Sequence, residues 1–248
     1  MPIQTISSSR LYRQIADQLA ELIRTGEFKP GDRLPSERDL SQQLGVSRAS
    51  VREALIALEI DGLIDVKVGL GVFVSATPFA PGEVMALTEP GPFEVLEARQ
   101  LIEGETAGLA ATHASSADLA AIRATVSMMA DEVKSTGAGL NADALFHLRI
   151  AEASGNGALV HMVKQLWNFR YSAMFRKLDE HFDTPARHAA AIQEHLKLVE
   201  AIERHDAAQA RAAIRAHLHS VRVALERGWE LANADSGSPV LLASTPWS

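Results

Sequence analysis

The fold of the N-terminal third is decided by Pro35-Ser36-Glu37-Arg38-Asp39-Leu40 followed by Gly45-Val46-Ser47-Arg48-Ala49-Ser50-Val51-Arg52-Glu53-Ala54-Leu55. The pattern predicts two short helices, each capped by a serine and joined by a tight turn at glycine. Hydroxyl and guanidinium groups crowd the start of the second helix, where free backbone amides and the helix dipole attract anions. This arrangement indicates a protein that holds phosphates and reads base edges in the major groove of DNA.

The residues on either side extend this pattern to a complete small domain. Leucine and isoleucine recur at helical spacing from about Arg10 to Thr25 and predict an additional helix before the pair. After the pair, 63–67 and 71–75 read as two short strands around a tip at 68–70. Three helices and a hairpin predict a winged helix-turn-helix over residues 1–75.

The rest of the chain is predicted to be helical. Residues 76–92 hold four prolines and two glycines, which is the composition of a linker. Residues 93–231 show six helical segments with short connectors, which predicts a six-helix bundle: 93–113, 116–135, 141–153, 156–178, 185–204 and 207–229. We expect a mainly α protein with a loosely ordered tail at 232–248.

Composition limits the function classes. The chain has 248 residues, 47% of them hydrophobic, and no cysteine, which excludes disulfides and thiolate chemistry. Neither a membrane-length apolar run nor a signal peptide is found, so we expect a cytoplasmic location and no membrane partner. The net charge is −7, and residues 1–75 carry 9 basic against 10 acidic side chains, which argues against indiscriminate nucleic-acid binding.

With these motifs in this order, the chain resembles the GntR family of bacterial transcription regulators. The helical part resembles the ligand-binding (FCD-type) domain of the FadR subfamily, and three stretches carry this likeness: 93–110 (FEVLEARQLIEGETAGLA), 143–156 (DALFHLRIAEASGN) and 195–218 (HLKLVEAIERHDAAQARAAIRAHL). Gly91-Pro92-Phe93, Trp167 with Arg170, and Pro246-Trp247 are most similar to the hexuronate-responsive branch.

The resemblance implies that a homodimer grips double-stranded operator DNA. By position it assigns six contact candidates, the last of them at the wing tip: Arg38, Ser47, Arg48, Ser50, Arg52 and Gly69. Arg48 and Arg52 lie four residues apart, so we expect both to face the groove. The alternative is that these arginines form surface ion pairs.

Four residues of the bundle point to a metal. Asp143 and His147 share one helix face with Ile150, while His195 and His217 lie on the inner stripes of two later helices. A buried aspartate and three histidines predict a divalent metal site, and the resemblance also implies a metal here. Zinc is the first choice, with nickel, manganese or iron open. The alternative is that each histidine is a core residue with an ordinary hydrogen bond.

The resemblance also implies an effector site. In relatives an arginine at the position of Arg99 meets the carboxylate of an acidic effector, which a guanidinium can hold with two parallel hydrogen bonds. Arg170 is added as a second candidate. A surface ion pair between Arg99 and Glu103 is the alternative reading.

The predicted function is therefore a sequence-specific transcription regulator, and not an enzyme. We expect a repressor that a small carboxylic acid, plausibly a sugar acid, releases from its operator when it binds beside the metal. Two alternatives stay open. One is a metal-sensing regulator. The other is a metalloenzyme fused to a DNA-binding module, with Glu103 and Glu105 as the nearby carboxylates to test.

Overall fold

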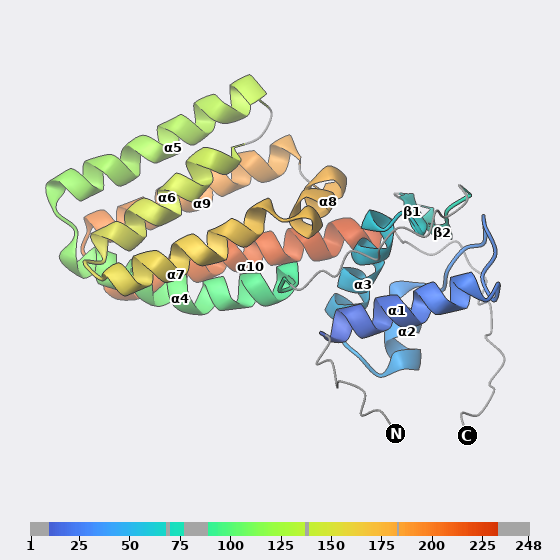
Figure 1. Ribbon diagram of the computed structural model, residues 1–248. Coiled ribbons are helices and arrows are strands. Elements are labelled where there is room, and N and C mark those ends of the chain that lie inside the picture. Colours follow the sequence, from blue (N-terminus) through green and yellow to red (C-terminus); the bar gives the residue numbers. More distant parts are fainter. Residues whose placement is uncertain (1–9, 68–69, 77–88, 137–138, 183, 233–248) are drawn as a thin grey trace, which may run out of the picture. The chain divides into compact units, whose positions relative to one another are not determined.

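The computed structural model describes residues 10–67, 70–76, 89–136, 139–182 and 184–232 (Figure 1). The chain divides into two compact units, the first containing the winged region and the second spanning Glu89–Glu226. Within the described residues the protein is mainly helical, as predicted, with a single two-stranded sheet. None of the described helices is long and apolar enough to cross a membrane.

The first unit contains three helices and a hairpin. The helices are α1 (Leu11–Arg24), α2 (Glu37–Leu44) and α3 (Arg48–Ile60). Both predicted caps form, since the Ser36 hydroxyl accepts from the amide of Asp39 and the Ser47 hydroxyl from that of Ser50. Gly45 ends α2 with φ of +66°, a left-handed conformation that favours glycine. The two serine caps and the glycine turn therefore form where the sequence predicts the ends of α2 and α3.

The wing is the antiparallel pair β1 (Ile64–Lys67) and β2 (Gly71–Val74). Alternate residues of β1 are buried, so one face of the hairpin joins the core under α3. The connector before α2 pairs with the backbone of β2. Arg33 and Phe73 form an antiparallel β-bridge, and the amide of Leu34 donates to the carbonyl of Val72. The tip residue Gly69 lies outside the described residues.

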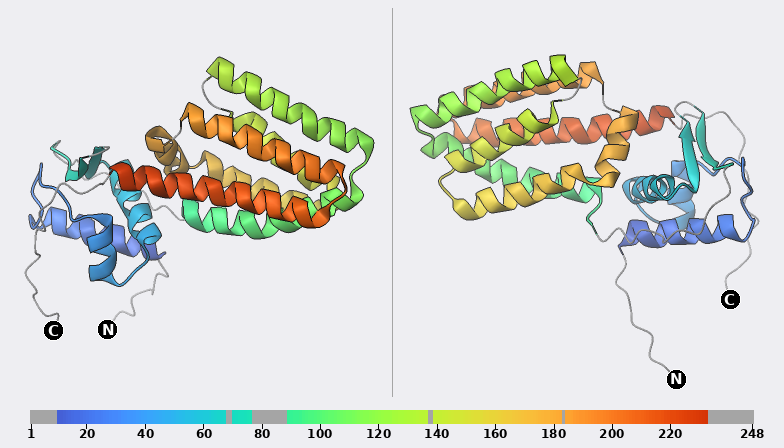
Figure 2. Two further views of the ribbon diagram at one scale, coloured as in Figure 1. Left: turned by 180° about the vertical axis from the view of Figure 1, so that it is seen from behind. Right: turned by 45° about the horizontal axis from the view of Figure 1, so that its top comes forward.

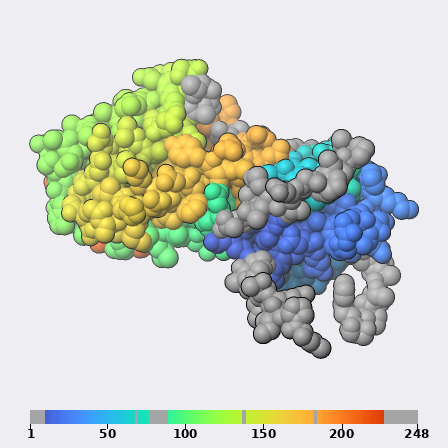
Figure 3. Space-filling view, viewed as in Figure 1, coloured from blue at the N-terminus to red at the C-terminus, as the bar shows by residue number. Residues whose placement is uncertain are grey.

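The second unit is a bundle of antiparallel and crossing helices (Figure 2). Its elements are α4 (Pro92–His113), α5 (Ser116–Thr136), α6 (Leu140–Ala153), α7 (Gly157–Asn168), the short 3-10 helix η1 (Phe169–Tyr171), α8 (Ala173–Phe182), α9 (Pro185–Glu203) and α10 (Ala207–Ala232), of which the residues up to Glu226 belong to this unit. Helix α4 contacts α6, α7 and α9, which makes it central to the unit. Helix α7 is largely exposed and buries only Val163 and Trp167 (Figure 3).

One predicted helix of the bundle is wrong. The segment 156–178 was expected to be continuous, but it breaks at η1 and restarts as α8. Ser172 has an extended backbone there, and its hydroxyl accepts from the amide of Phe175. Arg170 bridges the break through an ion pair with Asp179, at 2.8 and 3.1 Å. A cap and a local ion pair thus outweigh helical periodicity.

Candidate functional site

The predicted DNA-contact residues gather at the starts of α2 and α3. The side chains of Arg38 and Arg48 are 68% and 47% exposed. Ser47 is exposed and Ser50 half-buried, with their hydroxyl oxygens 2.9 Å apart. These four residues offer guanidinium and hydroxyl donors beside a helix N-terminus, which is the chemistry that phosphate and base edges require.

The expectation that Arg52 faces the groove is wrong. Its side chain is 2% exposed, and its guanidinium donates to both carboxylate oxygens of Glu37 at 2.9 Å. Glu37 is itself 3% exposed and also accepts from Arg48, at 2.7 Å. Arg52 therefore joins α3 to α2 inside the unit. A sequence spacing of four residues shows that the two arginines share a face, but not which of them the neighbouring helix covers.

The four predicted metal ligands come together in the bundle. One atom from each of Asp143, His147, His195 and His217 can be chosen so that all four lie within 4.8 Å of one another. The Oδ1 atom of Asp143 lies 3.4 Å from Nε2 of His147 and 3.5 Å from Nε2 of His195. Nε2 of His195 is 3.2 Å from that of His217. Helices α6, α9 and α10 supply these side chains, and their donor atoms face a common point.

The donor set fits a divalent ion. The three histidines are 0–3% exposed, yet Nε2 of His147 and Oδ1 of Asp143 are buried without a hydrogen-bond partner. Leaving such atoms unsatisfied is costly, and coordination to a cation would satisfy them. Three imidazoles and one carboxylate suit Zn²⁺, Ni²⁺, Mn²⁺ or Fe²⁺ rather than a soft metal.

Carboxylates outside the cluster hold two of these histidines. Nδ1 of His147 is hydrogen-bonded to Glu103, and Nδ1 of His217 is 2.8 Å from Glu194. In metal sites such carboxylates fix the orientation of the imidazole and increase its basicity as a ligand. The other ring nitrogen of each histidine is thereby directed to the common point.

The electrostatics of the cluster suit a cation. Burial lowers the pKa of His195 and of His217, so both imidazoles are neutral, the form that binds metals. Burial would raise the pKa of Glu103, but Arg99 and His147 lower it to about 2. For Asp143 the penalty of burial is outweighed by the neighbouring imidazoles of His147, His195 and His217, which hold its pKa well below the usual range. Burial would lower the pKa of His147 too, but the carboxylates of Glu103 and Asp143 outweigh burial and raise it. Two of the three imidazoles are therefore neutral beside ionised carboxylates.

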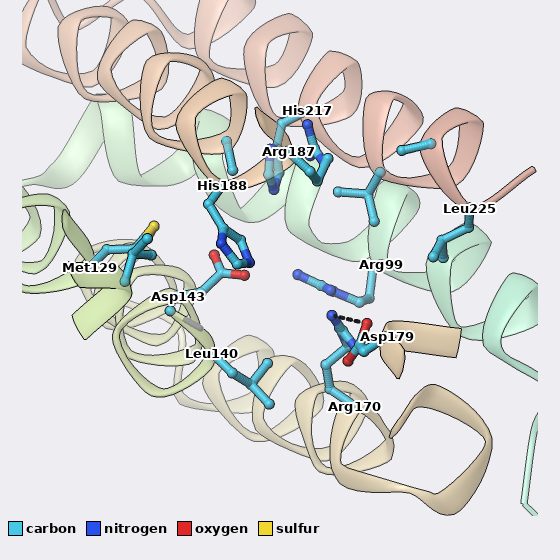
Figure 4. A pocket seen from close by; sticks show the side chains of 15 residues that line it. Arg99, Met129, Leu140, Asp143, Arg170, Asp179, Arg187, His188, His217 and Leu225 are labelled. Carbon is cyan, nitrogen blue, oxygen red and sulfur yellow. Dashed lines mark hydrogen bonds and ion pairs between the residues drawn. The ribbon is translucent and has the colours of Figure 1, made fainter. Parts of the chain in front are cut away.

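A pocket opens beside the cluster (Figure 4). Asp143 and His217 are both cluster residues and part of its wall, which also includes three arginines, Arg99, Arg170 and Arg187. Arg187 and His217 lie on one side of the pocket, and the pair of Arg170 with Asp179 lies on the other. The cluster and a set of guanidinium groups thus share one cavity, in which an anion could meet both.

The two predicted effector arginines both line this pocket. Arg99 does pair with Glu103, at 2.6 Å, but both side chains are 3–4% exposed, so the alternative of a surface ion pair does not describe this contact. The Arg99 guanidinium also lies over the ring of Trp167, at 4.1 Å. Sequence reasoning missed Arg187 and Glu194. Their seven-residue separation, two turns along α9, is the signal that would have placed them on one face.

Comparison with known proteins identifies the family. Residues 11–74 match the bacterial regulatory proteins of the gntR family, and residues 94–220 match the FCD domain. The chain belongs to the GntR family. Among its curated relatives are the "Uxu operon regulator" of Haemophilus influenzae (37% identical, 88% of this chain and 82% of the relative) and the "Uxu operon transcriptional regulator" of Escherichia coli (35% identical, 92% and 91%). The "Exu regulon transcriptional regulator" of Escherichia coli is 34% identical, over 87% of this chain and 84% of the relative.

The family match confirms three predictions. This GntR protein is a DNA-binding transcription regulator with an FCD domain, and it is not an enzyme. Its relatives with hexuronate-related names agree with the sugar-acid branch that the sequence resembles. The alternative of a metalloenzyme fused to a DNA-binding module is thereby excluded. Regulators of the GntR family bind operator DNA.

Proposed function

We propose that this regulator binds a divalent metal ion through Asp143, His147, His195 and His217 and recognises a small carboxylic acid next to that ion. The convergence of four ligand atoms within 4.8 Å of one another, beside a pocket lined by arginines, carries the proposal. Zinc is the first choice among the metals that this nitrogen and oxygen donor set accepts. When bound, the ion supplies positive charge and open coordination positions for effector oxygens.

The effector is proposed to be a sugar acid of the hexuronate class. Arg99 lies in the pocket wall and can hold a carboxylate by parallel hydrogen bonds. Arg170 and Asp179, paired in the same wall, offer both donors and an acceptor to the hydroxyl groups of a sugar. The relatives named Uxu and Exu regulators support this class.

The regulator is proposed to act as a cytoplasmic homodimer that represses transcription. Arg38, Ser47, Arg48 and Ser50 of each protomer, with Gly69 at the wing tip, would contact one operator half-site. An effector can shift this equilibrium only if it binds one arrangement of the dimer better than the other. Binding of the acid in the bundle would favour the arrangement whose winged units no longer match the half-site spacing, and the operator would be released.

The test is fluorescence anisotropy of a labelled duplex from upstream of the protein's own gene, at fixed salt and with added zinc. Hexuronates, aldonates, lactate and dicarboxylates are titrated into the complex. Release by one hexuronate, lost in the Asp143→Asn variant, is the expected outcome. Release by metal alone would instead support a metal-sensing regulator. Tight binding that no acid and no metal alters would refute the proposed effector.

A further inference from the structure

Arg187 pairs with Glu194, the carboxylate that is hydrogen-bonded to the proposed metal ligand His217. Its guanidinium contacts both oxygens of Glu194, at 3.2 to 3.4 Å, and the hydroxyl of Ser220, at 3.3 Å. Glu194 in turn accepts from Nδ1 of His217, at 2.8 Å. Arg187 and His217 are both part of the pocket wall (Figure 4). Arg187, Glu194 and His217 therefore form a chain of contacts that links the pocket wall to the metal cluster.

A second chain of the same kind is built more tightly. Arg99 donates to Glu103 at 2.6 and 3.5 Å, Glu103 bonds to His147, and all three side chains are 1–4% exposed. By contrast, the side chains of Arg187 and Glu194 are 16% and 22% exposed. Their contacts are also longer than the usual 2.9–3.0 Å of such hydrogen bonds. The chain from Arg99 is fixed by burial, whereas the chain from Arg187 is loosely held and open to exchange.

We propose that Arg187 is an exchangeable effector ligand that leaves Glu194 for the carboxylate of the bound acid, so that acid and metal strengthen each other's binding. The inference rests on the proposed function of the site. An incoming carboxylate would give the guanidinium a partner at the shorter distance typical of charge-assisted bonds. Arg187 acts on the metal only through Glu194 and is a positioning residue in that respect.

Whether the acid strengthens or weakens metal binding depends on how the hydrogen bond between Glu194 and His217 changes when Arg187 leaves. A carboxylate relieved of its guanidinium is a stronger acceptor for the Nδ1 proton of His217. A stronger acceptor makes the opposite nitrogen of the imidazole a better metal ligand. The acid should therefore tighten metal binding, and by reciprocity the metal should tighten binding of the acid by the same factor.

The experiment measures zinc affinity by competition with a chromophoric chelator, using the full chain with and without saturating D-glucuronate or D-galacturonate. In the wild type we expect one of these acids to tighten zinc binding about tenfold or more, a typical size for allosteric coupling. Glu194→Gln should weaken zinc binding by about 10–100-fold, the usual effect of losing such a carboxylate. Arg187→Gln should have the opposite effect without acid, a several-fold tightening, and should lose most of the response to acid.

A matched control is an exposed arginine and carboxylate pair of the same unit that contacts no histidine. Arg211 donates to Glu105 at 2.8 Å, and Arg211→Gln or Glu105→Gln should leave zinc affinity and its response to acid unchanged. The double variant Arg187→Gln, Glu194→Gln should bind zinc like Glu194→Gln alone, because Arg187 acts through Glu194. Opposite signs for the two single variants are a result that general loss of structure cannot produce.

Two results with the Arg187→Gln variant would overturn the exchange. One is weaker zinc binding in Arg187→Gln, and the other is an undiminished response of that variant to the acid. An acid that releases operator DNA from the wild type without changing zinc affinity would also overturn it, while leaving the proposed function intact. If none of the acids releases DNA or changes zinc affinity, the proposed effector class is wrong, and the exchange with it.

Discussion

The two units each use a glutamate to organise arginines, but they do so with different degrees of burial. In the winged unit Glu37 is 3% exposed and bonds Arg48 and Arg52 at 2.7 to 2.9 Å. In the bundle Glu194 is 22% exposed and contacts Arg187 at 3.2 to 3.4 Å. A buried carboxylate fixes a surface that must match DNA, whereas a half-buried one leaves a guanidinium free to take another partner.

Removing the buried carboxylate should give the largest effect. Glu37→Ala removes the carboxylate that the buried Arg52 guanidinium contacts, and we expect a loss of about 3–5 kcal/mol in the free energy of unfolding. Urea unfolding followed by circular dichroism measures the change. The control is Glu37→Met combined with Arg52→Met, which removes both charges and should cost far less. A loss below about 1 kcal/mol for Glu37→Ala, within the range of exposed pairs, would show that burial does not distinguish the two glutamates.

Metal binding to the bundle should give the next largest change in the free energy of unfolding. Zinc at about 100 times its dissociation constant should stabilise the folded protein by about 2.7 kcal/mol. His195→Ala removes a fully buried ligand and should abolish this gain, as measured by thermal unfolding with zinc or with a chelator. The control His219→Ala changes an exposed histidine two residues from His217 and should keep the gain. Equal gains in both variants would refute the ligand set.

The smallest of these effects should come from the two exposed arginines of the winged unit, Arg48, which pairs with Glu37, and Arg38, which pairs with Asp39. Arg48→Ala should weaken operator binding by about 1–3 kcal/mol if the side chain reads a base. Arg38→Ala should weaken binding evenly across sequences and reduce the salt slope by about one, as expected for a phosphate contact. Anisotropy titrations at several salt concentrations separate these cases. Arg149→Ala, an exposed arginine of the bundle, should leave both quantities unchanged.

Local signals in the sequence predicted most of the fold. The caps at Ser36 and Ser47 and the turn at Gly45 formed as expected, because each depends on residues within three or four positions. The same reliance on local periodicity led to the wrong prediction of a continuous helix after α7. Helical periodicity continues through 156–178, and only the ion pair of Arg170 with Asp179 and the cap at Ser172 stop the helix.

The candidate site could be predicted only in part. Inward-facing positions on three helices, together with the family resemblance, identified Asp143, His147, His195 and His217, whose donor atoms the structure brings together. The carboxylates behind two of these histidines were not assigned that role. Glu103 reaches His147 across 44 positions and Glu194 reaches His217 across 23, so the packing of the helices decides both contacts.

The sequence by itself determined most of the elements, their order and the family, because helix periodicity, caps and turns are encoded in residues close together along the chain. Only the tertiary structure decided that Arg52 is enclosed while Arg48 is exposed, and that Arg187 links the pocket to His217 through Glu194. Burial and hydrogen-bond partners of a charged side chain depend on which helix covers it, and that is a property of the packed molecule.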